Sequence, residues 1–444
     1  MRLWDLFRRP EVRAEPLATG ATTEVSERPR SVRELLTEMK DISEQTLDLA
    51  WAALAFDSRE IADEVQAMSL RSDRLLYEIR IAVMLAARDR RSAEQLAGLL
   101  QVANAAENLA EAADEITQLL DSDIAERLEL PFMLNRADEL MRTISVEDGE
   151  LWSMATMSDL LLESSTGVRV VALRRRDRWQ FRMNGSTRLR IGDLLMCRGT
   201  EDGFTRLREY IGGGAEKKKN TDSKDETAES TPKPGSSVNL FLAMKEMSEL
   251  MVDLAYSSLL FDSEGVATEV YYLNEEMDDS LYELQRRAVE GVAATCSPNT
   301  DIEVVSPDRA LGLMRLGSAV EAIAAAARSI ADATLRDIEP HPVLAASVRD
   351  SDSAVLRVHL AVEDPRDDGI EWVRIKQEHL TEAIGAMRLA SITGLWILAI
   401  RRKEAWIYEI DQLTHLKAND VVLLRGPEEG LERLRTLLSQ GNLE

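Results

Sequence analysis

The feature that most constrains this 444-residue chain is that its sequence is written twice. Residues 39–78 align without gaps on residues 244–283 at a constant offset of 205, and 18 of the 40 pairs are identical. Residues 166–208 align in the same way on residues 393–435 at an offset of 227, with 16 identities in 43 pairs. Two kinds of segment, A and B, therefore alternate, and we infer an A-B-A-B duplication.

The A segments have the spacing of amphipathic helices. Apolar residues recur at intervals of three and four between Leu35 and Leu54, which predicts a first helix. Asp57-Ser58 and its counterpart Asp262-Ser263 interrupt this pattern, and both residue types are favourable N-caps, so a second helix should begin there. A third helix is expected over Ala93–Leu120, or Pro307–Leu335 in the second copy. Each A unit is predicted to be a three-helix antiparallel bundle.

The B segments change to a strand pattern. Val168–Leu173 and Leu395–Ile400 are apolar runs rich in β-branched residues, as expected of well-buried strands. A polar turn and a second strand through Trp179 or Trp406 follow, then a further strand and a terminal helix. Each B unit thus reads as a small α+β domain of about 80 residues. We expect a first strand upstream at 140–146 or 354–362, and a crossover helix at 154–162 or 380–390.

The predicted fold is therefore an α+β multidomain chain in which helical bundles alternate with small α/β domains. The segment between the copies is rich in Lys, Asp, Ser, Thr and Pro, a composition that buries no face and indicates a flexible linker. The expected divisions are a disordered arm 1–30, a bundle 31–122, an α/β domain 130–212, the linker 213–236, a bundle 237–338 and an α/β domain 350–440.

Composition limits the classes of function. The formal charge of -25 repels nucleic acid and anionic lipid headgroups, which argues against a generic phosphate-backbone binder. Two cysteines cannot build a disulfide framework, so a reducing compartment is expected. The sequence shows neither a signal peptide nor a run of about 20 apolar residues. We expect a soluble cytoplasmic protein.

Both kinds of unit resemble known domains. The B pattern of Thr393-Gly394, Arg401-Arg402, Trp406, Asp420 and Arg425-Gly426 is similar to the TrkA-C (RCK C-terminal) domains of potassium-conductance regulators. The A units resemble PhoU-type helical bundles in helix register and carboxylate positions. The resemblance implies that two TrkA-C modules pair, within one chain or across a homodimer. It also implies a sensor of small ligands, some of them nucleotides, attached to a cation channel or transporter.

The candidate ligand contacts are the paired arginines after the first buried strand of each B unit, Arg174, Arg175, Arg401 and Arg402. Guanidinium groups at a strand end can bind phosphate oxygens in a fork, and the preceding aliphatic residues could cover a base. A nucleotide or cyclic dinucleotide at the TrkA-C pair is the corresponding cofactor hypothesis. The alternative is a solvated β-turn that carries charge for solubility.

The candidate metal ligands are Asp73, Glu107 and Glu111. PhoU-type proteins carry acid-x-x-x-acid motifs, which place two carboxylates one turn apart where they can share a cation. Here Ser69 precedes Asp73 where an acid is expected, and Ala325 fills the partner position of Glu321 in the second copy. Metal binding is therefore in question, and the alternative is a solvated acidic face.

These observations lead to a functional hypothesis. No catalytic constellation is present in the sequence, so we expect a non-enzymatic, cytoplasmic regulatory subunit. It would sense a small ligand or ion and control a membrane cation channel or transporter, potassium or divalent, and would lie at the inner face of the membrane through that partner. The alternatives are a PhoU-type adaptor in phosphate uptake and signalling, and a ligand-free structural scaffold.

Overall fold

The structure, a computed structural model, describes most of the chain. Of the predicted arm and linker, residues 1–29 and 213–235 lie outside the described residues. The description covers residues 30–121, 134, 137, 139–146, 155–212, 236–295, 303–336, 341–351, 355–361, 371–375 and 382–440, except for 177, 182, 184, 404, 409, 411 and 428.

Long helices form where the A segments predict them. Ser58 and Ser263 are N-caps, and each side-chain hydroxyl accepts the backbone N–H three residues on, which confirms the predicted start of the second helix in both copies. The preceding residues, Asp57 and Asp262, adopt the left-handed conformation that ends the first helix. The helices are α1 (Val32–Ala55), α2 (Arg59–Ala86) and α3 (Arg90–Thr117) with the 3-10 turn η2 (Gln118–Asp121), then α9 (Ser237–Phe261), α10 (Glu264–Ala294) and α11 (Pro307–Ala331).

The six long helices share a single hydrophobic core. Helix α11 packs against α3 of the other copy as well as against α9 and α10. The rings of Trp51 on α1 and Phe241 on α9 meet edge to face, 6.3 Å apart. A short helix, α12 (Pro342–Arg349), lies across α1 and α9. The sequence predicts the two bundles. It does not predict that their apolar faces pack against each other in one core.

Helix α11 is the one described helix that is long and apolar enough to cross a membrane. In the structure, 61% of its most apolar 18-residue window is buried. It packs against α3, α9 and α10, so its apolar character is that of a helix in a protein core.

Each B segment forms a small sheet, and the two sheets repeat one register. The strand order is β1-β4-β2-β3 in the first and β6-β5-β9-β7-β8 in the second, with β5–β6 parallel and the other pairs antiparallel. A bulge falls between Val170 and Ala172 and again, 227 residues later, between Ile397 and Ala399. The strands are β1 (Leu140–Ser145), β2 (Arg169–Arg175), β3 (Arg178–Gln180), β4 (Leu194–Gly199), β5 (Val355–Ala361), β6 (Glu371–Arg374), β7 (Trp396–Arg402), β8 (Ala405–Ile407) and β9 (Val421–Arg425).

The predicted crossover helix is broken in both domains. Leu161 and Arg388 adopt left-handed backbone conformations with φ of 44° and 50°, and each divides the segment into two short helices. A longer helix then closes each domain, as the sequence predicts. These helices are α6 (Met157–Leu160), α7 (Leu162–Thr166) and α8 (Glu201–Gly212), and α13 (Ile384–Met387), α14 (Leu389–Thr393) and α15 (Glu429–Gln440).

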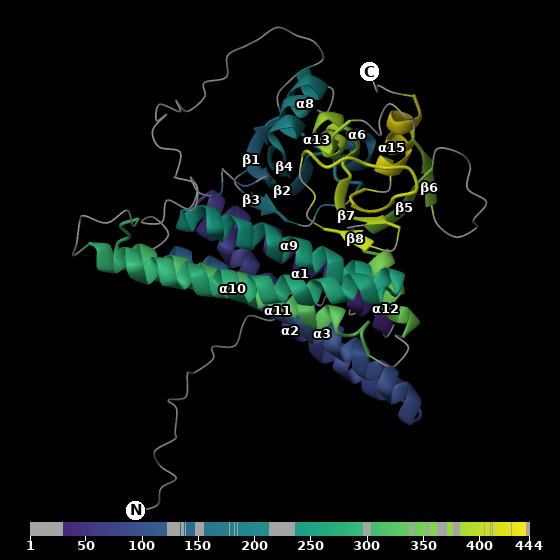
Figure 1. Ribbon diagram of the computed structural model, residues 1–444, viewed down its shortest axis with the longest axis horizontal. Coiled ribbons are helices and arrows are strands. Elements are labelled where there is room, and N and C mark those ends of the chain that lie inside the picture. The colour runs from purple at the N-terminus through teal and green to yellow at the C-terminus, as the bar shows by residue number, and fades with distance from the viewer. Residues whose placement is uncertain are drawn as a thin grey trace, which may run out of the picture.

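The two sheet domains lie side by side on one face of the helical layer (Figure 1). They contact each other mainly through α7 and α14, where Arg433 donates a hydrogen bond to Ser165 at 2.8 Å and Arg388 pairs with Asp202 at 2.8 Å. One face of each sheet joins the helical core. The structure therefore brings the two sheet domains into contact within a single chain.

Two glycines at this contact test the pairing of the sheet domains. Both have positive φ, and a Cβ would lie 2.3 Å from the Ala390 carbonyl oxygen at Gly167 and 2.4 Å from the Glu163 carbonyl oxygen at Gly394. Gly167→Ala and Gly394→Ala should each lower the free energy of unfolding by about 2 kcal/mol or more, because backbone strain and a backbone clash act together. Urea unfolding measures this loss.

Gly98→Ala is the matched control. Gly98 lies within α3, and nothing stands within 4 Å of an added Cβ. Alanine there should raise stability by up to about 1 kcal/mol. Equal effects of the three substitutions would contradict the close contact of α7 with α14.

Candidate functional site

Where the helices meet the sheet domains, helix α1 carries a ladder of charged residues. Lys40, Glu44 and Asp48 follow one another at intervals of four, so they lie on one face of the helix. Lys40 is 3% exposed, and its ammonium pairs with Glu44 at 2.6 Å. It also lies 4.9 Å from the centre of the Tyr256 ring. A lysine this deeply buried needs such partners to keep its charge.

Helix α9 repeats the ladder at an offset of 205 with Lys245, Glu249 and Asp253. Lys245 pairs with Glu249 at 2.7 Å and lies 5.2 Å from the centre of the Trp51 ring on α1. Each lysine therefore contacts an aromatic ring of the other copy, at positions that are themselves equivalent. These reciprocal contacts hold α1 and α9 together beneath the sheets.

Each sheet sends one arginine into these ladders. Arg198, at the end of β4, pairs with Asp48 of α1, with Glu249 of α9 at 2.9 Å and with Glu139 before β1. The side chain of Arg198 is 12% exposed. A single guanidinium thus joins both bundles to the first sheet domain.

The second sheet domain uses the equivalent residue, Arg425 on β9. It binds Asp253 at 3.0 Å and lies 3.6 Å from Glu139. Because Glu139 contacts both arginines, the two sheet domains and the two helical ladders share one network of ion pairs.

Burial and neighbouring charge act differently on two carboxylates of this network. Burial alone would raise the pKa of Glu249, but Arg198 and Lys245 outweigh it and lower the pKa to about 2. At Asp253 burial outweighs the attraction of Arg425 and raises the pKa to about 6. Glu249 is therefore ionised at neutral pH, whereas Asp253 changes its protonation state near pH 6.

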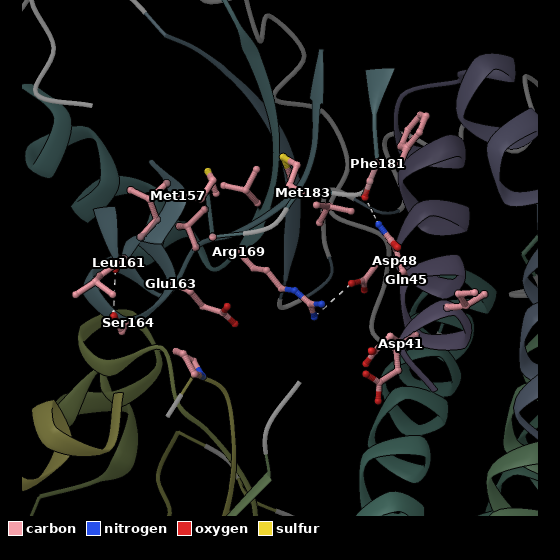
Figure 2. Close-up of a pocket in the computed structure, with 18 of the residues that line it drawn as sticks. Asp41, Gln45, Asp48, Met157, Leu161, Glu163, Ser164, Arg169, Phe181 and Met183 are labelled. Carbon is pink, nitrogen blue, oxygen red and sulfur yellow. Dashed lines mark hydrogen bonds and ion pairs between the residues drawn. The ribbon is translucent and has the colours of Figure 1, made fainter. Parts of the chain in front are cut away.

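A cavity of about 550 Å³ opens beside this network, between α1 and the first sheet domain. Figure 2 shows Asp41, Gln45 and Asp48 on the helical wall, with Arg169 and Glu163 projecting from the sheet domain toward the same space. Its apolar wall includes Met157, Leu161, Phe181 and Met183. The size and the mixed lining are those of a small-molecule site at a domain boundary.

Arg169 and Glu163 give the cavity its chemical character. Arg169 lies 3.5 Å from Asp48, so it touches the carboxylate that Arg198 also binds. Burial raises the pKa of Glu163, and Arg169 and Arg425 only partly offset this. At the equivalent positions of the second domain stand Ala390 and Trp396. This pair of charges thus belongs to the first domain alone.

Two of the predicted ligand arginines are engaged inside their own domains. Arg175 donates from Nε and Nη2 to the two carboxylate oxygens of Asp193, at 2.8 and 2.6 Å. Arg402 does the same to Asp420, at 3.0 and 2.8 Å. Asp193 and Asp420 are almost fully buried. These forked pairs fix the turn before β4 and β9, and phosphate binding by Arg175 and Arg402 stays a prediction.

The other two predicted arginines face the helices. Arg174 lies over the Trp179 ring at 5.9 Å, and Arg401 lies over the Trp406 ring at 5.8 Å, and both rings pack against the helical core. The described lining of the cavity includes none of the four arginines. Their role as ligand contacts also stays a prediction.

The predicted metal ligands come together in part. Glu107 on α3 hydrogen bonds to Asp73 on α2, and burial, this bond and the charge of Glu111 raise the pKa of Glu107 to about 7. Within the described part of the chain, no group of three or more His, Cys, Asp or Glu residues is arranged to hold a metal ion. Two carboxyl groups that share a proton explain the contact without a cation.

The network and the cavity were not predicted from the sequence, although a signal for the network was present. Lys40 and Lys245 are two of only ten lysines in the chain, and they occupy equivalent positions within apolar helical stripes. Asp48 and Asp253, and Arg198 and Arg425, are likewise identical in the two copies. Charged residues kept in both copies at positions that should be buried mark an internal ion-pair network. The cavity has no such signal, because Glu163 and Arg169 differ from their counterparts.

Comparison with protein families gives a match to one segment of the chain. Residues 241–334, from α9 through α11, match the PhoU domain family. A comparison with curated proteins finds no match. The match covers α9 to α11, one of the two helical segments that resemble PhoU-type bundles in sequence.

Solved structures give a weaker likeness. The GsuK channel bound to NAD is 12% identical, with a TM-score of 0.16, over 77% of this chain and 65% of the channel. The GsuK RCK domain is 10% identical, with a TM-score of 0.17, over 76% of this chain and 79% of that domain. The chain therefore spans less than two thirds of the full channel, and similarity at these TM-scores carries no argument on fold or activity.

Two isosteric substitutions test the network. Glu249→Gln should lower the free energy of unfolding at pH 7 by about 3 kcal/mol, because it leaves Arg198 and Lys245 buried with one counter-charge fewer. Asp253→Asn should cost less at pH 7, because the burial that opposes the ionised form of Asp253 offsets much of the pair that is lost with Arg425. Urea titration of both variants beside the parent measures the contrast, and equal losses would contradict it.

The pH dependence supplies a second check on Asp253. Its pKa lies above its ordinary value of 3.8, at about 6, so between these pH values the folded protein holds a proton that the unfolded chain has lost. The parent's free energy of unfolding therefore falls through this window because of Asp253, by up to about 3 kcal/mol. Asp253→Asn lacks this component, so its stability relative to the parent should rise from pH 4 to pH 6.

Proposed function

We propose that this chain is a non-enzymatic regulatory protein that couples the level of a small cytoplasmic ligand to a membrane cation channel or transporter. The observation that carries the proposal is the cavity between α1 and the first sheet domain, because Asp48 belongs both to its wall and to the ion-pair network. A ligand in this cavity contacts the network that seats the sheets on the helices.

The coupling runs through competition for Asp48. Arg169 and Arg198 both contact this carboxylate, from the cavity side and from the sheet side. A ligand that takes the place of Arg169 beside Asp48 changes the charge around Arg198, and so changes the preferred position of the sheet pair on α1 and α9. The extent of the change is limited by the ligand's difference in affinity for the two positions.

The lining of the cavity favours a ligand with positive charge. Among the residues that the structure describes, six acidic side chains and two arginines, Arg71 and Arg169, line it, and the apolar wall suits a hydrocarbon portion. A nucleotide or cyclic dinucleotide belongs instead to the hypothesis of the paired arginines, such as Arg174 and Arg401. We also propose that the two halves derive from one duplicated PhoU-like and TrkA-C-like unit, since their strand registers and buried charges correspond.

The match to the PhoU domain family supports a second candidate, an adaptor for phosphate uptake and signalling that binds a transporter or a sensor kinase. In this case Asp73 and Glu107, which contact each other, would form part of a cation site. The two candidates differ in the partner that the helices bind, and purification from membranes separates them.

Arg169→Trp tests the proposed site, because the second domain carries tryptophan at the equivalent position and the fold tolerates it there. The tagged 444-residue chain should first recover a cation channel or transporter from mildly solubilised native membranes. The variant should recover the same partner in equal amount. Cation flux through the partner should then lose at least about 80% of its response to cytoplasmic extract, because the larger ring occupies the ligand's space.

Arg176→Lys is the control, since Arg176 lies in an exposed turn and lysine occupies the equivalent position. It should leave both partner recovery and flux unchanged. Recovery of phosphate-uptake or kinase components without a cation transporter would favour the adaptor. A normal flux response in Arg169→Trp would remove the cavity from the mechanism.

A further inference from the structure

The outer face of α2 carries an exposed apolar stripe. The exposed fractions are 52% for Leu70, 65% for Tyr77, 39% for Ile81, 68% for Met84 and 81% for Leu85. At 100° per residue these five positions fall within an arc of about 100°, so they form one continuous face. The opposite face of the helix packs into the core. An exposed stripe of this length on a helix is typical of an interaction surface.

The second copy shows that the fold does not require this stripe. The inner face of α10 packs into the core as the inner face of α2 does. Val266, Val270 and Leu284 are buried at the positions equivalent to Ile61, Val65 and Ile79. Its outer face is nevertheless different. The residues equivalent to Leu70, Arg74, Tyr77, Ile81, Met84, Leu85 and Arg88 are Glu275, Asp279, Tyr282, Arg286, Val289, Glu290 and Ala293. At the positions of Leu70, Ile81 and Leu85 α10 carries charged residues, so the fold does not require these three apolar side chains.

The charge of the two faces differs as well. Residues 74–91, at the end of α2 and the start of α3, contain five arginines against Glu78 and Asp89, a net charge of +3. The equivalent residues 279–296 carry three acids and two arginines, a net charge of -1. Arg74 lies on the apolar stripe itself, at the position of Asp279, and Arg88 follows directly after the end of α2, at the position of Ala293. In a chain of net charge -25, this basic and apolar end is an exception that points to an anionic partner.

The end of the α2–α3 hairpin is also free to approach a flat surface. Figure 1 shows the hairpin extending past the other helices, on the side of the helical layer away from the sheet domains. All residues from Met84 to Arg91 are exposed. Since charges are screened over about 8 Å at physiological salt, the acidic remainder of the chain does not cancel the attraction at this end.

We propose that the α2–α3 hairpin end is a docking surface for an anionic lipid membrane. Met84, Leu85 and Ile81 enter the boundary between headgroups and acyl chains, Tyr77 lies at the headgroup level, and Arg74 and Arg88 bind lipid phosphates. An amphipathic helix face with arginines at its polar edge binds membranes in this way. The surface places the protein beside a membrane partner by a contact of its own, independent of the ligand cavity.

A second copy of the chain fits this surface less well. The equivalent face of α10 is acidic, but a contact between α2 of one copy and α10 of another joins different surfaces, so it gives a ring or an open filament and no symmetric dimer. An acidic helix of a membrane protein would supply charge complementarity but no reason for the most exposed apolar residues to gather at the hairpin end. A bilayer accounts for both the charge and the position.

Vesicle sedimentation with the 444-residue chain tests the proposal. The parent should sediment with vesicles of 30% phosphatidylglycerol in phosphatidylcholine and remain in solution with pure phosphatidylcholine. Met84→Asp combined with Leu85→Glu should weaken binding roughly tenfold through loss of the apolar contact. Arg74→Asp combined with Arg88→Ala should weaken it by roughly thirtyfold or more, since each arginine near an anionic surface contributes about a factor of five to ten.

Val289→Asp on α10 is the matched control and should bind as the parent does. The substitutions at positions 74, 85 and 88 introduce residues that α10 carries at its equivalent positions, so unchanged circular dichroism and thermal unfolding are expected. Equal binding to both vesicle types, or parental binding by both double variants, would overturn the proposal. Failure to bind vesicles together with recovery of a membrane protein that the double variants lose would also overturn it, and would assign the surface to a protein partner.

Discussion

The arrangement of the whole molecule depends on two arginines that enter the helical layer from above. Apolar contacts join the sheets to the helices over a wide area, but such contacts are not directional. Arg198 and Arg425 add directional pairs with Asp48, Glu249 and Asp253. Buried charges of this kind stabilise a fold only while every partner is in place. They therefore define where each sheet lies on α1 and α9, and a shift of a sheet leaves a charge without its partner.

Much of the fold could be predicted from the sequence, because the relevant signals are local. N-caps at Ser58 and Ser263, helical stripes and buried strand runs each depend on neighbours within a few residues, and the structure contains the corresponding elements. The broken crossover helices were missed, since Leu161 and Arg388 are not residue types that favour the left-handed conformation. The shared core of the two bundles was missed because apolar stripes show that a face is buried but not against what.

The site was harder to predict for a physical reason. Paired arginines after a strand suggest a ligand, yet the same residues also suit an internal clamp, and only the position of Asp193 and Asp420 shows that Arg175 and Arg402 make one. The cavity arises where α1 and the first sheet domain meet, more than 100 residues apart in sequence, and its charged pair Glu163 and Arg169 has no repeated counterpart to draw notice. Residues shared by the halves describe the scaffold, and residues that differ describe what each half does.

The contact of α7 with α14 inside one chain has a consequence for stoichiometry. Two identical modules that pair across a symmetric dimer must present the same site twice, so a ligand meets two coupled sites and its response can be sigmoidal. Once both modules belong to one polypeptide, each is free to change alone. Arg169 in one module and Trp396 in the other show such a separation. A pair with one charged cavity would bind its ligand along a simple hyperbolic saturation curve, and would give a graded signal in place of a threshold.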